Sequence, residues 1–259
     1  MIIALTVNRL YNLVIHGTYT KNTRDMNLVL TTSLYVADSE DDKLIKEESV
    51  RALFVETMNK LKESESNYSF AEPGLRKLEE HYEEHYDIIT VDTTSQMFVE
   101  YAEKQGYRPG IEAEQEADRM SKVIISSLLR DNIGKYCKVY FASWIHGMIK
   151  TVSKRGALTD LFAFIMYFGY IMLMIACLIG KENRDAGFVG LFGLIAIIVN
   201  VGVVAALIFC DTRYMIYNMS VFYVIGIIMF EKIFKDLIKK NISYEIRTSK
   251  NGQDYGDKQ

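Results

Sequence analysis

The sequence predicts an all-α integral membrane protein, in which a helical extracytoplasmic domain precedes three transmembrane helices. The first observation is that long apolar runs occur only within residues 161–230. The second is that charge gathers before them: residues 17–155 hold 19 Lys/Arg and 24 Asp/Glu, whereas residues 161–230 hold three basic residues. The third is the helical spacing of apolar residues in the charged part. The chain averages, 49% hydrophobic residues and a net charge of −3, conceal this division.

Three apolar runs approach the length of about 20 residues that a transmembrane helix needs. Residues 161–180 contain no charge, and residues 187–210 contain one strongly polar residue, Asn200. We expect Asn200 to hydrogen-bond to a neighbouring helix, as polar side chains in membranes commonly do. Residues 214–230 form the shortest run. Because short loops separate the three runs, we predict that residues 158–231 are the membrane part.

The basic residues near the ends of these runs indicate an orientation, since cytoplasmic loops are enriched in Lys and Arg. The tail 232–259 contains seven basic residues, the KENRDA loop at 181–186 contains two, and the DTR loop at 211–213 contains one. The tail and the KENRDA loop are therefore predicted to be cytoplasmic, with the tail close to anionic headgroups. The DTR loop and the domain at residues 17–157 are then predicted to lie outside the cell.

Residues 1–16 fit neither a signal peptide nor a complete membrane span. Their apolar start is interrupted by Asn8 and Arg9, and it lacks a basic n-region. One explanation is that the first downstream span acts as an internal signal. The other, which we favour, is that Met1 begins near the outer end of a membrane helix whose beginning lies outside this sequence.

The extracytoplasmic domain, residues 17–157, is predicted to be helical. In one stripe, Val50, Leu53, Phe54 and Met58 follow one another at steps of three, one and four residues, as on one face of a helix. Residues 87–91 are the most strand-like segment, but one short segment makes no sheet. The expected helices are 25–37, 47–61, 73–84, 93–104, 111–130 and 133–153, the last amphipathic and close to the bilayer surface.

Two polar segments invite a metal-site interpretation. In HYEEHYD, residues 81–87, His81 and His85 would share a helix face and could hold zinc. The strongly polar flanks instead favour a solvated helix end. Residues 38–49 are acidic but lack the EF-hand spacing and its central glycine, which favours a helix-capping loop. We therefore predict no metal, no cofactor and no catalytic residue in this chain.

Other features narrow the function classes. Only Cys137 of the three cysteines falls in the extracytoplasmic domain, so no internal disulfide is possible there, and Cys177 and Cys210 suit apolar packing. The net acidic charge of the chain does not favour nucleic-acid binding. The single tryptophan, Trp144, is typical of an anchor at the membrane interface.

The stretch DTRYMIYNMSVFYVIGIIMF, residues 211–230, places Arg213 beside Tyr214 and Tyr217 at the end of a predicted span. One interpretation is an arginine that reaches the headgroup region next to an aromatic belt. The other is a lipid-phosphate site, in which the Arg213 guanidinium grips a phosphate. Tyr217 lies one helical turn further on and would line the same site.

Three segments carry a resemblance to a known family: NRLYNLVIHGTYTKNTRDMNLVLTTSLYVADSEDDKLIKEESVRALF, HYDIITVDTT and DTRYMIYNMSVFYVIG. They resemble the C-terminal half of multi-pass membrane proteins of Gram-positive bacteria. Those proteins are similar to glycosyltransferases that use polyprenyl-phosphate sugars, the class of protein O-mannosyltransferases and aminoarabinose transferases. The resemblance implies membrane helices beside an outward-facing domain, and inverting transfer of a sugar from the lipid carrier to an extracytoplasmic acceptor.

In that class the acidic catalytic residue sits in the first outer loop, after the first membrane helix, and this sequence contains neither. The resemblance therefore implies a C-terminal portion that is inactive alone, with a membrane portion N-terminal to it. Arg213 would contact the lipid phosphate, with Tyr217 beside it. The alternative is a non-enzymatic membrane protein whose extracytoplasmic domain binds a partner or a cell-envelope polymer.

Overall fold

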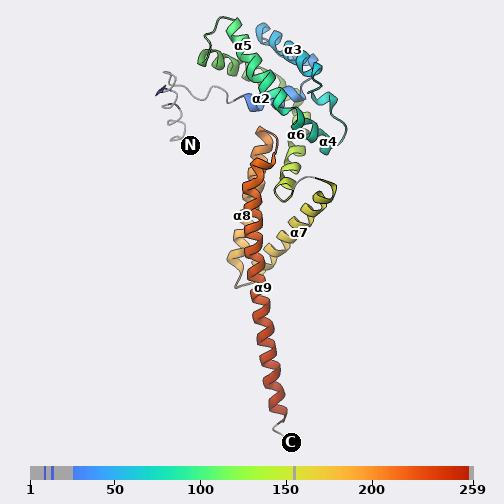
Figure 1. The fold of residues 1–259 in the computed structure, drawn as a ribbon, viewed down its shortest axis with the longest axis vertical. Helices are drawn as coiled ribbons and strands as arrows, with labels where there is room; N and C mark the ends of the chain where they lie inside the picture. Colours follow the sequence, from blue (N-terminus) through green and yellow to red (C-terminus); the bar gives the residue numbers. More distant parts are fainter. Residues whose placement is uncertain (1–8, 10–12, 15–25, 154–155, 257–259) are drawn as a thin grey trace. The chain divides into compact units, whose positions relative to one another are not determined.

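The computed structural model describes residues 9, 13–14, 26–153 and 156–256, and the regular structure in these ranges is entirely helical (Figure 1). The all-α prediction is therefore confirmed for this part of the chain. The chain divides into two compact units: Met1–Trp144 with Val204–Phe209, and Ile145–Val203 with Cys210–Gln259. The proposed membrane-helix end at residues 1–16 lies outside the described residues, apart from three isolated positions.

The first unit contains most of the predicted helices at nearly the predicted positions. They are α2 (Asn27–Val36), α3 (Glu48–Glu63), α4 (Leu75–Asp87) and α5 (Gln96–Lys104), with the short 3₁₀ helices η1 (Ser39–Leu44) and η2 (Tyr68–Phe70).

The expected break between helices 111–130 and 133–153 is absent, because α6 (Ile111–Lys150) is one helix of 40 residues. Asn132 lies between the two expected helices, and its amide donates to the Leu128 carbonyl at 3.4 Å and to Asp41 at 2.7 Å. Neither Pro nor a left-handed residue interrupts the backbone there. The two adjacent polar residues Asp131 and Asn132 therefore do not end the helix.

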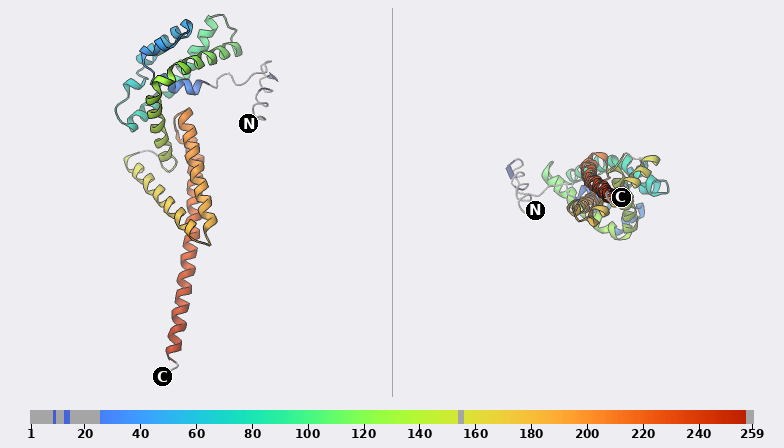
Figure 2. Two further views of the ribbon diagram at one scale, coloured as in Figure 1. Left: turned by 180° about the vertical axis from the view of Figure 1, so that it is seen from behind. Right: turned by 90° about the horizontal axis from the view of Figure 1, so that it is seen from below.

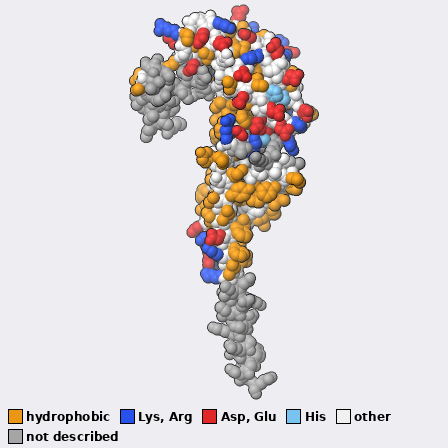
Figure 3. Space-filling view, in the orientation of Figure 1, with side chains coloured by type: hydrophobic (Ala, Val, Ile, Leu, Met, Phe, Trp, Pro, Cys, Tyr) orange, Lys and Arg blue, Asp and Glu red, His pale blue; other side chains and the backbone are white. Residues whose placement is uncertain are grey.

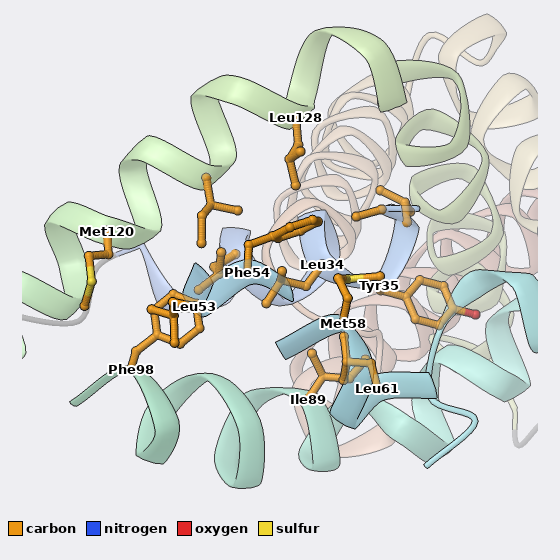
Figure 4. Packing of buried hydrophobic residues seen from close by; sticks show 14 of the residues in the cluster. Leu34, Tyr35, Leu53, Phe54, Met58, Leu61, Ile89, Phe98, Met120 and Leu128 are labelled. Atoms are coloured by element: carbon orange, nitrogen blue, oxygen red, sulfur yellow. The ribbon is translucent and has the colours of Figure 1, made fainter. Parts of the chain in front are cut away.

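The core of the first unit joins helices that are distant in sequence (Figure 4). The predicted stripe on α3, Val50, Leu53, Phe54 and Met58, is buried throughout. Figure 4 shows Leu34 of α2, Phe98 of α5 and Met120 and Leu128 of α6 directed towards the same interior. Removal of this apolar surface from water is the main driving force that holds the helices together.

The segment 87–91, which the sequence marked as most strand-like, forms no strand. Asp87 ends α4, and residues 88–91 belong to a π-helix, η3 (Ile88–Ser95), that joins α4 directly to α5. The Thr93 hydroxyl donates to the Ile88 carbonyl at 3.0 Å, five residues back, and Thr94 donates to Thr90 at 2.8 Å. Both hydroxyls donate to backbone carbonyls within η3, so these β-branched threonines stabilise a helix here.

The acidic segment after α2 is a capping loop, as predicted. Asp38 and Asp41 form a reciprocal capping box at the start of η1, and the Asp38 backbone N–H donates to the Asp41 carboxylate at 2.8 Å. Lys135 of α6 lies 2.5 Å from the Asp38 carboxylate. The carboxylates therefore attach the loop to α6.

The second unit is built from α7 (Ala157–Ile179), α8 (Arg184–Leu207) and α9 (Thr212–Gly256). Two helices of the described residues, Leu158–Ile179 and Arg184–Leu207, are long and apolar enough to cross a membrane. The prediction of three such spans is therefore wrong in number. Residues 214–230 instead begin α9, a helix of 45 residues that continues without a break into the basic tail (Figure 2). The EKIFKDLIKK stretch after Phe230 consists largely of good helix formers, which favours continuation of the helix as far as Lys240.

Helix α8 packs closely on both of its neighbours through a row of glycines at steps of three residues. A Cβ atom on Gly187 would lie 2.8 Å from the Leu178 backbone nitrogen of α7, and one on Gly193 would lie 2.4 Å from Ile225 of α9. Small residues at such contacts are typical of helix packing in membranes. The Asn218 amide of α9 donates to Asn200 Oδ1 at 3.1 Å, which confirms the expected interhelical bond of Asn200.

Candidate functional site

Arg213 stands in the first turn of α9, where the backbone is organised by Asp211. The Asp211 carbonyl accepts from the backbone N–H groups of Tyr214, at 3.1 Å, and Met215, at 3.3 Å. The Asp211 carboxylate lies 3.0 Å from Arg213 Nε. A carboxylate at a helix N-terminus is favourable because the helix dipole is positive there. Asp211 therefore starts the helix and positions the arginine.

The guanidinium of Arg213 also packs on an aromatic ring. Its Cζ lies 5.0 Å from the centre of the Tyr214 ring, within the range of a cation–π contact. The side chain is 64% exposed, so its terminal N–H groups, which form a planar fork, can meet a phosphate from outside. The negative charge of Asp211 offsets the positive charge of Arg213, which weakens the long-range attraction of an anion. The terminal N–H groups of the guanidinium stay accessible to a phosphate.

Tyr217, the second predicted site residue, is 79% exposed and lies one turn beyond Arg213 on the same helix. The described contacts of Arg213 go to Asp211 and Tyr214. The structure thus joins Arg213 to its immediate neighbours, while Tyr217 extends the exposed aromatic surface along α9.

An apolar groove of about 340 Å³ lies between α7 and α9 in the second unit. The Tyr170 hydroxyl donates to the Gly190 carbonyl at 3.0 Å, and the Tyr223 hydroxyl donates to the Val152 carbonyl at 2.7 Å. Phe222 stacks on Tyr170 with ring centres 4.8 Å apart. Since these bonds hold both lining tyrosine hydroxyls, the groove suits a hydrocarbon chain.

Glycines open this groove. A Cβ atom on Gly169 would meet nothing within 4 Å, and one on Gly226 would come only as near as 3.8 Å to Tyr170. On α9 the lining residues begin at Phe222 and end at Phe230, roughly 14 to 26 Å along the helix from Arg213 at 1.5 Å per residue. Sequence reasoning missed the groove, for which the glycines within the apolar runs were the only signal.

The histidines of the HYEEHYD segment, residues 81–87, have a structural role. The Tyr35 hydroxyl lies 3.0 Å from His81 Nδ1, and His81 Nε2 lies 3.1 Å from the Glu65 carbonyl. The rings of His81 and His85 stack with centres 4.3 Å apart. Helix α4 ends at Asp87, as the helix-end interpretation expected. Both histidines are nevertheless half-buried, and the chain continues directly into η3. Burial, and secondly the neighbouring His85, lower the pKa of His81.

A second groove, of about 490 Å³, is open and polar and lies between α3, η3 and α5. Its rim carries Glu56, Glu63, Asp92 and Glu100. Lys60 donates to the Asp92 carbonyl across it, at 2.5 Å. These residues come from three elements, so no local sequence pattern marked the groove.

No family model matches the chain, and the searches of curated proteins and of solved structures gave no match either. Over the residues that the structure describes, the fold and the sites define the class only as an all-α protein with two helices long and apolar enough to cross a membrane.

Proposed function

We propose that this chain is an integral membrane protein that binds a polyprenyl-phosphate lipid through Arg213. In this proposal it forms the C-terminal portion of a glycosyltransferase, which transfers a sugar from that lipid to an extracytoplasmic acceptor. The observation that carries the proposal is the exposed Arg213 guanidinium, positioned by Asp211 and Tyr214 on the helix that also lines an apolar groove.

The exposed apolar surface of the second unit supports a membrane location. Figure 3 shows hydrophobic side chains gathered over α7 to α9 and charged side chains over the helical domain. Phe164 of α7 is 70% exposed and Phe192 of α8 is 69% exposed. Within the apolar windows of these two helices, only 22% and 28% of the residues are buried. Exposed apolar surface of this extent suits contact with lipid.

The two parts of the site match the two parts of a phosphate-linked lipid. The guanidinium fork suits a phosphate, and the groove between α7 and α9 suits a hydrocarbon chain. The separation along α9 is one that an extended hydrocarbon chain can span, and the resemblance to glycosyltransferases favours a polyprenyl lipid as its source. The resemblance to glycosyltransferases supplies the reaction, and a membrane portion N-terminal to this chain would supply the acidic residue that acts as the catalytic base.

The experiment is a binding measurement on the full chain in lipid nanodiscs, with polyprenyl phosphate as ligand and the uncharged polyprenol as reference. Replacing Arg213 by Ala should weaken phosphate binding about fivefold, as expected when one exposed charge contact of about 1 kcal/mol is lost. Binding of the alcohol should not change. Lys235→Ala is the matched control, since Lys235 is an exposed cation on the same helix, paired with Glu231. Equal effects of the two substitutions would refute the proposal.

The neutral Asp211–Arg213 pair favours a second candidate, a non-enzymatic membrane protein whose helical domain binds a partner or an envelope polymer. Phosphate binding that is unaffected by Arg213→Ala, together with retention of the chain on purified cell-wall polymer, would support this function.

A further inference from the structure

Asn200 is a polar residue on the exposed side of a membrane-type helix. It belongs to α8, seven positions before the last helical residue, Leu207, which places it about 10 Å inside that end of the helix. Its side chain is exposed in the second unit. The surrounding face is apolar, with Val199 59% exposed and Val203 54% exposed.

The contact with Asn218 uses only part of the hydrogen-bonding capacity of Asn200. Asn200 Oδ1 accepts from the buried Asn218 amide at 3.1 Å. An amide oxygen has a second lone pair, and the amide nitrogen carries two N–H donors. In the hydrocarbon region these groups find no water, and hydrocarbon chains provide no acceptor. The exposed amide therefore favours a polar partner at the same depth.

We propose that the partner is Asn200 of a second copy of this chain, so that the protein is a dimer through α8. In a two-fold arrangement each Asn200 donates one N–H to the Oδ1 atom of the other copy. Each Oδ1 then accepts from both its own Asn218 and the partner amide, which fills both lone pairs. A two-fold contact is self-complementary by construction, so one residue serves both sides.

The neighbouring residues permit the close approach that this bond requires. Ala196, one turn before Asn200, is also exposed, and small residues allow membrane helices to come together. The glycines of α8 face α7 and α9. Asn200 lies two helical turns after Gly193 and borders this contact, so its amide stands at the edge of the exposed face that contains Ala196. Acyl chains could cover the apolar residues of this face, but they provide no hydrogen-bond partner for the Asn200 amide.

The inference rests on the proposed membrane location and is independent of lipid binding at Arg213. The measurement is subunit counting by single-molecule photobleaching, for the labelled full chain in liposomes at several protein-to-lipid ratios. Wild type should bleach mainly in two steps. Asn200→Leu should shift dimerisation to about tenfold higher protein density, as expected for loss of two interhelical bonds.

Asn218→Leu is the matched control, because it removes the same intrachain bond but leaves the Asn200 amide. It should retain the dimer. The double substitution to leucine, which leaves no lone amide in the membrane, should be monomeric at the densities where Asn218→Leu is dimeric. One-step bleaching of wild type, equal effects of both single substitutions, or a different stoichiometry would overturn the inference. Extraction of the chain from membranes at alkaline pH would instead refute the membrane location.

Discussion

At the scale of single residues, His81 connects α4 to Tyr35 of α2 and to the Glu65 carbonyl that follows α3. The Glu65 carbonyl can only accept a hydrogen bond, so His81 Nε2 carries the proton and Nδ1 accepts from the Tyr35 hydroxyl. The sequence indicated that His81 and His85 share a helix face. It did not indicate Tyr35, 46 positions earlier, because that contact depends on how α2 packs on α4.

The lowered pKa of His81 gives a direction of pH dependence. Because the folded state holds this histidine neutral, its contribution to stability is complete above the ordinary pKa of 6.5 and is lost as the pH falls below it. Protonation of Nδ1 would also remove the acceptor of the Tyr35 hydroxyl and place a charge beside His85. The acids Glu65 and Glu84 oppose the shift without reversing it.

We predict that His81→Gln makes the stability of the protein less dependent on pH between 7.5 and 5. The substitution removes the group that titrates, so the loss of stability on acidification should become smaller. Thermal unfolding of the full chain in detergent, followed by circular dichroism at several pH values, measures this. An unchanged slope with pH would show that other groups cause the acid sensitivity.

At the scale of elements, apolar periodicity was sufficient to place helices but not to join or divide them. The α3 stripe was predicted residue by residue, because its spacing and its burial have one cause. The sequence did not indicate that Asn132 of α6 bonds to Asp41 of η1, because that is a tertiary contact. The π-helix was misread because β-branched residues favour strands locally, while the threonine hydroxyls that bind carbonyls within η3 stabilise a helix.

We predict that Gly187→Ala destabilises the helix packing of the second unit by about 1–3 kcal/mol, as is typical of an overpacked contact. The added methyl would lie 2.8 Å from the backbone nitrogen of Leu178, which has no rotamer by which to move away. Gly169→Ala is the control, since its methyl would meet nothing within 4 Å. Thermal unfolding midpoints in detergent compare the two variants. Equal midpoints would show that α7 and α8 adjust without cost.

At the scale of the whole molecule, the division of charge along the sequence was enough to predict one mainly charged unit and one mainly apolar unit. The candidate sites could be predicted from the sequence only in part. Arg213 stood out because a cation at the end of an apolar run is conspicuous. The groove between α7 and α9 requires residues about 50 positions apart to meet, such as Tyr170 and Phe222. The sequence alone gave no register between those two helices.

The proposed orientation predicts a labelling pattern in intact cells. Cys137 is exposed, whereas Cys177 and Cys210 are buried. A membrane-impermeant maleimide added outside should therefore label the wild type and leave Cys137→Ser unlabelled. Labelling of Cys137 only after the cells are opened would place the helical domain in the cytoplasm and reverse the orientation.

The unbroken course of α9 has a mechanical consequence. From Glu231 to Gly256 the helix continues for 26 residues, which is a stiff arm of about 39 Å. With no hinge at Phe230, a change of ten degrees in the direction of the apolar segment moves the far end of this arm by about 7 Å. A small reorientation of the apolar segment of α9 would therefore displace the end of the basic tail by several ångströms.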